Sequence, residues 1–380
     1  MPQTVREQKK NSREAAPELL RIIGALMVIG THLKQGYFTG NGSLIYSRVM
    51  IACFVAEGVA IFWLICGFYF PGNVDSKLSY REIMKKAVRR ILIPVLGLSV
   101  FTFFFAGFLV DGKTLAESIH HSPDVYRKLI KSLFQWKNAV SDCFHLWYMY
   151  VYFLVMLCFP LPWGLVCWAR SRSKSYYALY FLWAALLIND AFHNSIFNFS
   201  HYSINGMAGA LVYIFTGSIL YQWRNEFAGN KRWCLAGILM FLGANLLRFH
   251  FTCEHLLADP KDILMLYWYT NFGFISSIGI VLTVWGIIPW IQKNEPLKKL
   301  ICHLGSRTMG IYLIHYLVLK KTWNMGLNRK LNAVFGGTAA GSVLYQLVYM
   351  LIIFLLSLII VEVYYYVRSW ADSVRPGDQC

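Results

Sequence analysis

The chain has too few charged side chains for a soluble protein of its length. Asp, Glu, Lys and Arg make up 14% of the 380 residues, whereas hydrophobic residues make up 57%. Soluble domains carry about 25% charged and roughly 45–50% apolar residues, and a chain this poor in charge could not cover a water-facing surface. We therefore expect an integral membrane protein, and not a soluble, collagenous or disordered one.

The sequence also lacks the motifs of several common site types. Its nine cysteines are scattered without a CxxC pair, and we find no Gly-rich phosphate loop and no metal-ligand spacing. The composition does not fit a disulfide scaffold either. We expect no bound metal, and we expect most of the cysteines to be small core residues.

Acidic residues are few beside basic ones, which gives a net charge of +17 from 36 Lys and Arg and 19 Asp and Glu. In an apolar chain this excess indicates loops that face the cytoplasm and anionic lipid, rather than a nucleic-acid partner. The distribution of Lys and Arg over the loops favours an N-terminus and a C-terminus that are both cytoplasmic. We expect a multi-pass protein of the cell membrane.

Apolar stretches that can span a bilayer, which takes about 20 residues, recur along the chain. We expect about ten transmembrane helices in one all-α bundle, near 17–35, 49–71, 91–110, 144–168, 176–192, 204–222, 233–249, 264–291, 304–319 and 340–367. The chain then divides into a cytoplasmic leader (1–16), a membrane domain (17–367) and a cytoplasmic tail (368–380).

Two titratable side chains interrupt the first expected span. Arg21 and His32 are eleven residues apart, which is three helical turns plus about 20°, so both lie on one face of a helix. At 1.5 Å per residue they stand about 16 Å apart along its axis. Each alone is typical of a snorkelling arginine or an interfacial histidine. Their shared face favours a pair that lines the interior of the bundle.

Glu57 lies in the outer half of the second expected span, near the level of His32. A carboxylate beside an imidazole favours the protonated ring, or fixes the tautomer whose other nitrogen acts as a base. The alternative is a structural hydrogen bond to a neighbouring helix, and the sequence leaves both open.

A basic run, REIMKKAVRRILIP, precedes the third expected span and contains Lys86, Arg89 and Arg90. Such a run is typical of a cytoplasmic anchor, but beside Arg21 it would also bind the phosphates of an anionic cofactor. On the outer side, polar residues recur near the ends of spans, and together they predict a cavity that opens outwards; the candidates for its substrate side are His145, Asp190 and His315.

Five segments, in this order, resemble the signatures of the membrane-bound acyltransferase 3 family: Arg21-x10-His32, GVAIFWLICGF, RRILIP, HLWYMY and SRTMGIYLIHYLVL. The resemblance covers nearly the whole chain and implies a ten-helix membrane domain. It implies transfer of an acyl group, commonly acetyl, from cytoplasmic acyl-CoA to an extracytoplasmic glycan. It also implies that His32 is the central catalytic histidine and that Arg21, with the basic run, serves the acyl-CoA.

The sequence departs from the pattern of this family at three positions. Ala87 stands where many members have an arginine, which shifts the basic pair to Lys86 and Arg89. Ala60 replaces a common aspartate, and Glu57, one turn away on the same face, is the residue that would substitute for it. Cys66 replaces a common serine. The soluble esterase-like domain that some members carry is not expected here.

The main hypothesis is therefore an O-acyltransferase that uses acetyl-CoA or another acyl-CoA to modify a cell-envelope polysaccharide or other polymer, with His32 as base or acyl carrier and Glu57 as its partner. A transporter or flippase for an anionic or glycan substrate is the alternative, although we find no inverted repeat of the kind many transporters have. An inactive sensor or assembly domain is a third. The acceptor stays open among peptidoglycan, exopolysaccharide, lipid-linked oligosaccharide and a small secreted metabolite.

Overall fold

The computed structural model describes residues 14–33, 43–69, 80–120, 122–134, 141–157, 204–258 and 270–374. These residues form helices and their connections, and no strand occurs among them. Six helical segments in these ranges are long and apolar enough to cross a membrane by length and composition. The prediction of an all-α membrane protein is confirmed. The number of about ten spans is not, and the fifth expected span (176–192) lies outside the described residues.

Each of the remaining nine expected spans overlaps a helix of the described residues. The first four correspond to α2 (Ala15–His32), to α3 (Ser43–Phe54) with α4 (Gly58–Tyr69), to α6 (Ile93–Leu109) and to α9 (Trp147–Leu157). The later ones are α12 (Ile204–Gln222), α14 (Lys231–Ala258), α15 (Thr270–Lys293), α16 (Glu295–Asn324) and α18 (Ala339–Val374). Short elements connect them: α5 (Tyr80–Ala87), α7 (Leu115–Ile119), α8 (Pro123–Phe134), a 3-10 turn η3 (Ser141–Leu146), α13 (Arg224–Phe227) and α17 (Leu327–Phe335).

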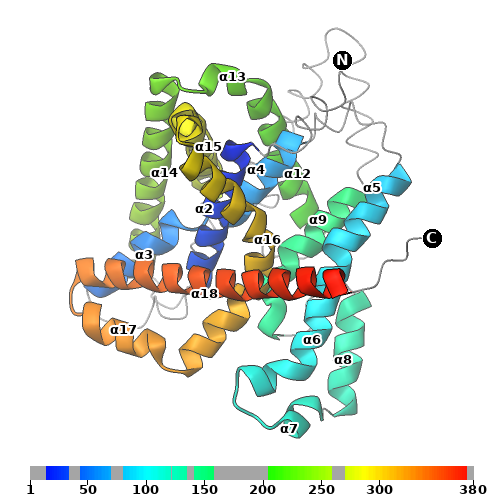
Figure 1. Cartoon of the computed structure of the whole chain (residues 1–380). Coiled ribbons are helices and arrows are strands. Elements are labelled where there is room, and N and C mark those ends of the chain that lie inside the picture. Colours follow the sequence, from blue (N-terminus) through cyan, green and yellow to red (C-terminus); the bar gives the residue numbers. More distant parts are fainter. Residues whose placement is uncertain are drawn as a thin grey trace.

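Helix α2 lies in the interior of the bundle, in contact with α4, α15, α16 and α18 (Figure 1). Its approach to α4 is close because both helices present glycine at the crossing. A Cβ atom on Gly58 would lie 2.6 Å from the backbone nitrogen of Val28, and one on Gly24 would lie 3.2 Å from the carbonyl oxygen of Gly58. Small residues allow such backbone contact between membrane helices. The crossing fixes α2 against α4.

Helix α16 runs parallel to α2 along its length. At one end, a Cβ on Gly305 would overlap the side chain of Glu18, and at the other end the rings of His315 and Tyr316 lie beside His32. Helix α16 is less apolar than the six long spans because it carries four lysines, Arg307 and two histidines. Its polar residues are therefore available to a site beside α2.

The basic run forms a widened turn. Residues Val88–Leu92 are a π-helix, η2, between α5 and α6. Pro94 stands two residues after Leu92, and a proline cannot donate to the carbonyl four residues earlier and clashes with it in a regular α-helix. That carbonyl belongs to Arg90, so the π-turn is where this long helix accommodates Pro94. Such single π-turns are frequent at functional sites.

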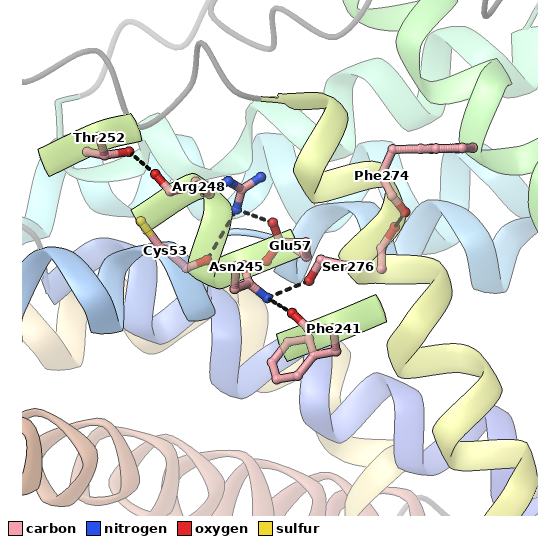
Figure 2. Close-up of polar contacts among 9 residues, drawn as sticks. Cys53, Glu57, Phe241, Asn245, Arg248, Thr252, Phe274 and Ser276 are labelled. Carbon is pink, nitrogen blue, oxygen red and sulfur yellow. Dashed lines mark hydrogen bonds and ion pairs between the residues drawn. The ribbon is translucent and has the colours of Figure 1, made fainter. Parts of the chain in front are cut away.

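The second span is broken at Val55–Glu57, and a side chain from α14 fills the break. Arg248 donates from Nη1 to the carbonyl of Cys53 over 3.1 Å and forms an ion pair with Glu57 (Figure 2). Both side chains are almost completely buried, at 4% and 2% exposed. Within a bilayer a freed carbonyl has no water to bond, so an internal donor is needed.

Helix α14 carries this contact on a polar stripe. Asn245 donates to the hydroxyl of Ser276 in α15 over 2.7 Å and to the carbonyl of Phe241 over 2.8 Å, and Thr252 donates to the carbonyl of Arg248 (Figure 2). These residues are three or four apart and therefore share a helix face. The stripe attaches α14 to α15 and to the broken second span.

We expect Arg248→Leu to destabilise the protein by about 3–5 kcal/mol, because a buried carboxylate then loses its cation. The single change Glu57→Leu leaves the guanidinium alone and has a similar effect. Thermal unfolding of the detergent-solubilised protein measures both. In the double variant neither charge remains, so part of the loss is recovered. Single variants that melt as the wild type does would contradict this role for the ion pair, and His250→Ala, at an exposed position of α14, is the control.

Candidate active site

Three histidines from three distant segments meet at one end of α2. The ring centroid of His32 lies 5.3 Å from that of His315 and 6.1 Å from that of His145, and those two rings are 4.9 Å apart. Tyr316 completes the group at 5.6 Å from His32. Among the described residues, no group of His, Cys, Asp and Glu is placed to hold a metal ion. Three residues that the sequence selected separately thus lie together.

The ring of His315 is held in one tautomer. It is fully buried, and its Nδ1 lies 2.7 Å from the carbonyl oxygen of Tyr312 in the same helix. Since a carbonyl only accepts, Nδ1 carries the hydrogen, and Nε2 of the neutral ring is an acceptor. Nε2 has no hydrogen-bond partner within the described part of the chain. An imidazole with one fixed nitrogen and one open acceptor has the arrangement of a general base.

His145 is attached to the same helix through two contacts. Its Nε2 lies 3.0 Å from the carbonyl oxygen of Leu313, and its own backbone carbonyl accepts a hydrogen bond from the hydroxyl of Tyr312. By the same argument Nε2 is the donor and Nδ1 the acceptor of the neutral ring. The 3-10 turn η3 is therefore joined to α16 at the level of the histidines.

A cavity of about 530 Å³ lies between the histidines and the N-terminal end of α2. This volume is within the roughly 300–1,000 Å³ of small-molecule sites. Three basic residues line it, Arg21 from α2, Lys86 from α5 and Arg90 from η2. Most of the remaining wall is apolar or aromatic. Cations at one end and apolar walls beyond them suit a ligand with an anionic head and a less polar arm.

Two contacts orient the guanidinium of Arg21 in this cavity. The buried carboxylate of Glu18 accepts a hydrogen bond from it, and the guanidinium carbon lies 5.4 Å from the ring centroid of Tyr69. Sequence reasoning missed both partners. The spacing of three between Glu18 and Arg21 was an available signal for the first, whereas the contact with Tyr69 depends on the crossing of α2 and α4.

Some predicted site residues do not lie at this site. Glu57 forms its ion pair with Arg248 of α14, which is the structural alternative that the sequence left open. Arg89 is exposed and is not among the described residues that line the cavity. Asp190 lies outside the described residues. Roles for Glu57, Arg89 and Asp190 in the reaction stay predictions.

Two tyrosines of the site were not singled out from the sequence. Tyr148 and Tyr312 line the cavity, and each stands three residues from a histidine of the cluster, His145 and His315. A spacing of three puts two residues on one helix face. That spacing could have predicted an aromatic neighbour for each histidine, although not the cavity between them.

Comparison with known families agrees with this geometry. A family model described as an acyltransferase domain matches residues 14–362. No curated protein and no solved structure gives a significant match. The matched range runs from the start of α2 into α18 and contains both the histidines and the basic cavity. The chain therefore belongs to the membrane-bound acyltransferase 3 family.

Proposed function

We propose that this protein is an O-acyltransferase that moves an acyl group, in the simplest case acetyl, from cytoplasmic acyl-CoA to a hydroxyl of an extracytoplasmic glycan or cell-envelope polymer. Membership of the family supports acyl transfer in a membrane. The observation that carries the finer proposal is the arrangement along α2, with a cationic cavity around Arg21 and a histidine cluster around His32.

We place acyl-CoA, the donor, in the cavity because the charge and shape of the cavity suit it. The phosphates of CoA pair with Arg21, Lys86 and Arg90, with Arg89 outside the lining as a further cation. The pantetheine arm then follows the apolar wall towards His32, over a separation of about 16 Å along the helix. With the N-terminus in the cytoplasm, as the basic loops favour, CoA binds from inside and only the acyl group reaches the outer side.

The reaction needs one base and a route for one proton. The hydroxyl of the acceptor attacks the thioester carbonyl carbon while His32 takes its proton, so that a C–O bond forms and the C–S bond breaks. The CoA thiolate then takes that proton from the imidazolium, which restores the neutral ring. No further reactant is required.

His315 is proposed as a positioning residue for His32. Ring nitrogens project outwards from the centroids, so a centroid separation of 5.3 Å allows a hydrogen bond between the two rings. Nε2 of His315 has no hydrogen-bond partner among the described residues, and its Nδ1 is held by Tyr312. In the proposed reacting state this Nε2 accepts from a ring N–H of His32. The other nitrogen of His32 is then the unprotonated one, as a base requires.

The change His32→Ala removes the proposed base. We expect the release of CoA from acetyl-CoA, and the transfer of labelled acetyl to membrane glycans, to fall by at least about 100-fold, the lower range for loss of a general base. The protein should still enter the membrane and elute as the wild type does. His250→Ala, a histidine exposed on α14, is the matched control. Unchanged transfer in His32→Ala would refute the mechanism, and uptake of an anionic or glycan substrate without acylation would favour the transporter.

The basic cavity predicts a specific change in affinity for the donor. Lys86→Ala and Arg90→Ala each remove a cation from the lining, so we expect KM for acetyl-CoA to rise about tenfold or more, which corresponds to about 1.4 kcal/mol. Raising the salt concentration should reduce the difference, because these contacts are electrostatic. Arg81→Ala, an exposed position of the same basic helix, should leave KM unchanged. Equal effects of all three changes would point to surface charge instead of a site.

The change His315→Asn tests whether His315 positions His32 or only fills space in the core. The amide of asparagine reproduces the Nδ1 donor to the carbonyl of Tyr312 but offers no acceptor at the position of Nε2. We expect kcat to fall about tenfold or more with KM for acetyl-CoA unchanged, and the pH profile of kcat to shift. If His315→Asn keeps the wild-type kcat and only His315→Ala loses activity, His315 is structural.

A further inference from the structure

Three aromatic rings close the end of the cavity that faces the histidines. Phe62 of α4, Tyr148 of α9 and Tyr312 of α16 all line the cavity, and each ring contacts the other two. The centroids lie 5.8 Å apart for Phe62 and Tyr148, 6.1 Å for Phe62 and Tyr312, and 5.6 Å for Tyr148 and Tyr312. We call this closed triangle the aromatic collar.

The collar stands between the two parts of the proposed site. On α2, Gly24 marks its level, because a Cβ there would lie 3.4 Å from the ring of Phe62, and Gly24 lies between Arg21 and His32 in the helix. Two of the histidines lie on the other side of the collar. The ring of Tyr312 is 5.9 Å from that of His145 and 5.8 Å from that of His315. None of the three histidines is among the described residues that line the cavity.

The rings of the collar are held by their surroundings. The hydroxyl of Tyr312 donates to the carbonyl of His145. Tyr148 is buried, and the centroids of Trp63 and Tyr152 lie 4.5 Å and 6.2 Å from its own. Packed interiors of this kind change between discrete arrangements and do not deform gradually. The collar therefore has a defined closed state, and a ligand that passes it must displace rings.

Resting on the proposed function, we propose that the aromatic collar selects the length of the acyl group. The acyl-thioester end of CoA passes between the rings to reach His32, while the charged part stays with the cations of the cavity. The uncharged thioester meets apolar ring faces, and the diphosphate does not, because burial of charge there is unfavourable. The acyl group then lies between the collar and the histidines, where the ring of Tyr312 is only 5.9 Å from that of His145 and 5.8 Å from that of His315. Each additional methylene in this space requires further displacement of the rings, so the collar favours acetyl over longer acyl groups.

Phe62 gives the sharpest test because it supplies one ring of the collar and is not assigned to the chemistry. With acetyl-CoA and hexanoyl-CoA compared by CoA release, we expect Phe62→Ala to raise the ratio of kcat/KM for hexanoyl-CoA over acetyl-CoA at least about tenfold. Pocket discrimination of about 10–200-fold per methylene makes this measurable. Phe54→Ala is the matched control, since Phe54 is equally half-buried in the same span but packs on Phe241. It should leave the ratio unchanged.

The outcomes separate the collar from the proposed function. If the wild-type protein releases no CoA and transfers no label from acetyl-CoA, the proposed function is wrong. If the wild type is active and the ratio stays constant in Phe62→Ala, the collar does not select the acyl group and is core packing only. If Phe62→Ala fails to fold, Phe62→Leu is the alternative variant because it keeps most of the side-chain volume. We expect Phe62→Leu to raise the same ratio by a smaller factor. An unchanged ratio in Phe62→Leu would equally overturn the inference.

Discussion

The close packing of α2 against α4 and α16 brings together the residues at the centre of the proposed site, Arg21, His32 and His315. Glycines at the crossings bring the backbones of α2 and α4 into contact, and Gly305 lets α16 lie directly on Glu18. Arg21 and His32 are thereby presented to the same interior space at two levels. The cationic cavity, the aromatic collar and the histidine cluster follow one another along this contact, and none of them belongs to a single helix. A larger side chain at these glycines would push the helices apart.

A second constraint is the unfavourable burial of charge in a membrane protein. The buried charged groups discussed here have partners: Glu18 with Arg21, and Glu57 with Arg248, which also bonds the carbonyl freed by the break in the second span. The histidines are held differently, because carbonyls of α16 accept from His145 and His315 and fix their tautomers. Structural charge is thus neutralised in pairs, while neutral His315 keeps Nε2 as an acceptor for chemistry.

The helices and several residues of the site could be predicted from the sequence, but the contacts between distant helices could not. The spacing of eleven between Arg21 and His32 requires only helical geometry, so their shared face was predictable. That His145 and His315 would join His32 depends on which helices pack together, which periodicity does not reveal. Glu57 shows the limit most clearly. Its level in the membrane was predictable, but its direction depends on Arg248, a partner 191 residues away in α14. The π-turn Val88–Leu92 was not predicted either, and of the two arginines in it only Arg90 is among the described residues that line the cavity.

The proposed donor site is a single elongated one that runs from the basic residues past the collar to His32. A structure of the purified protein with an unreactive thioether analogue of acetyl-CoA tests it most directly. We expect the diphosphate beside Arg21, Lys86 and Arg90, and the thioether sulfur beyond the ring of Phe62 within contact of His32. A diphosphate bound away from these cations, or an acyl end that stays on the Arg21 side of the collar, would contradict it.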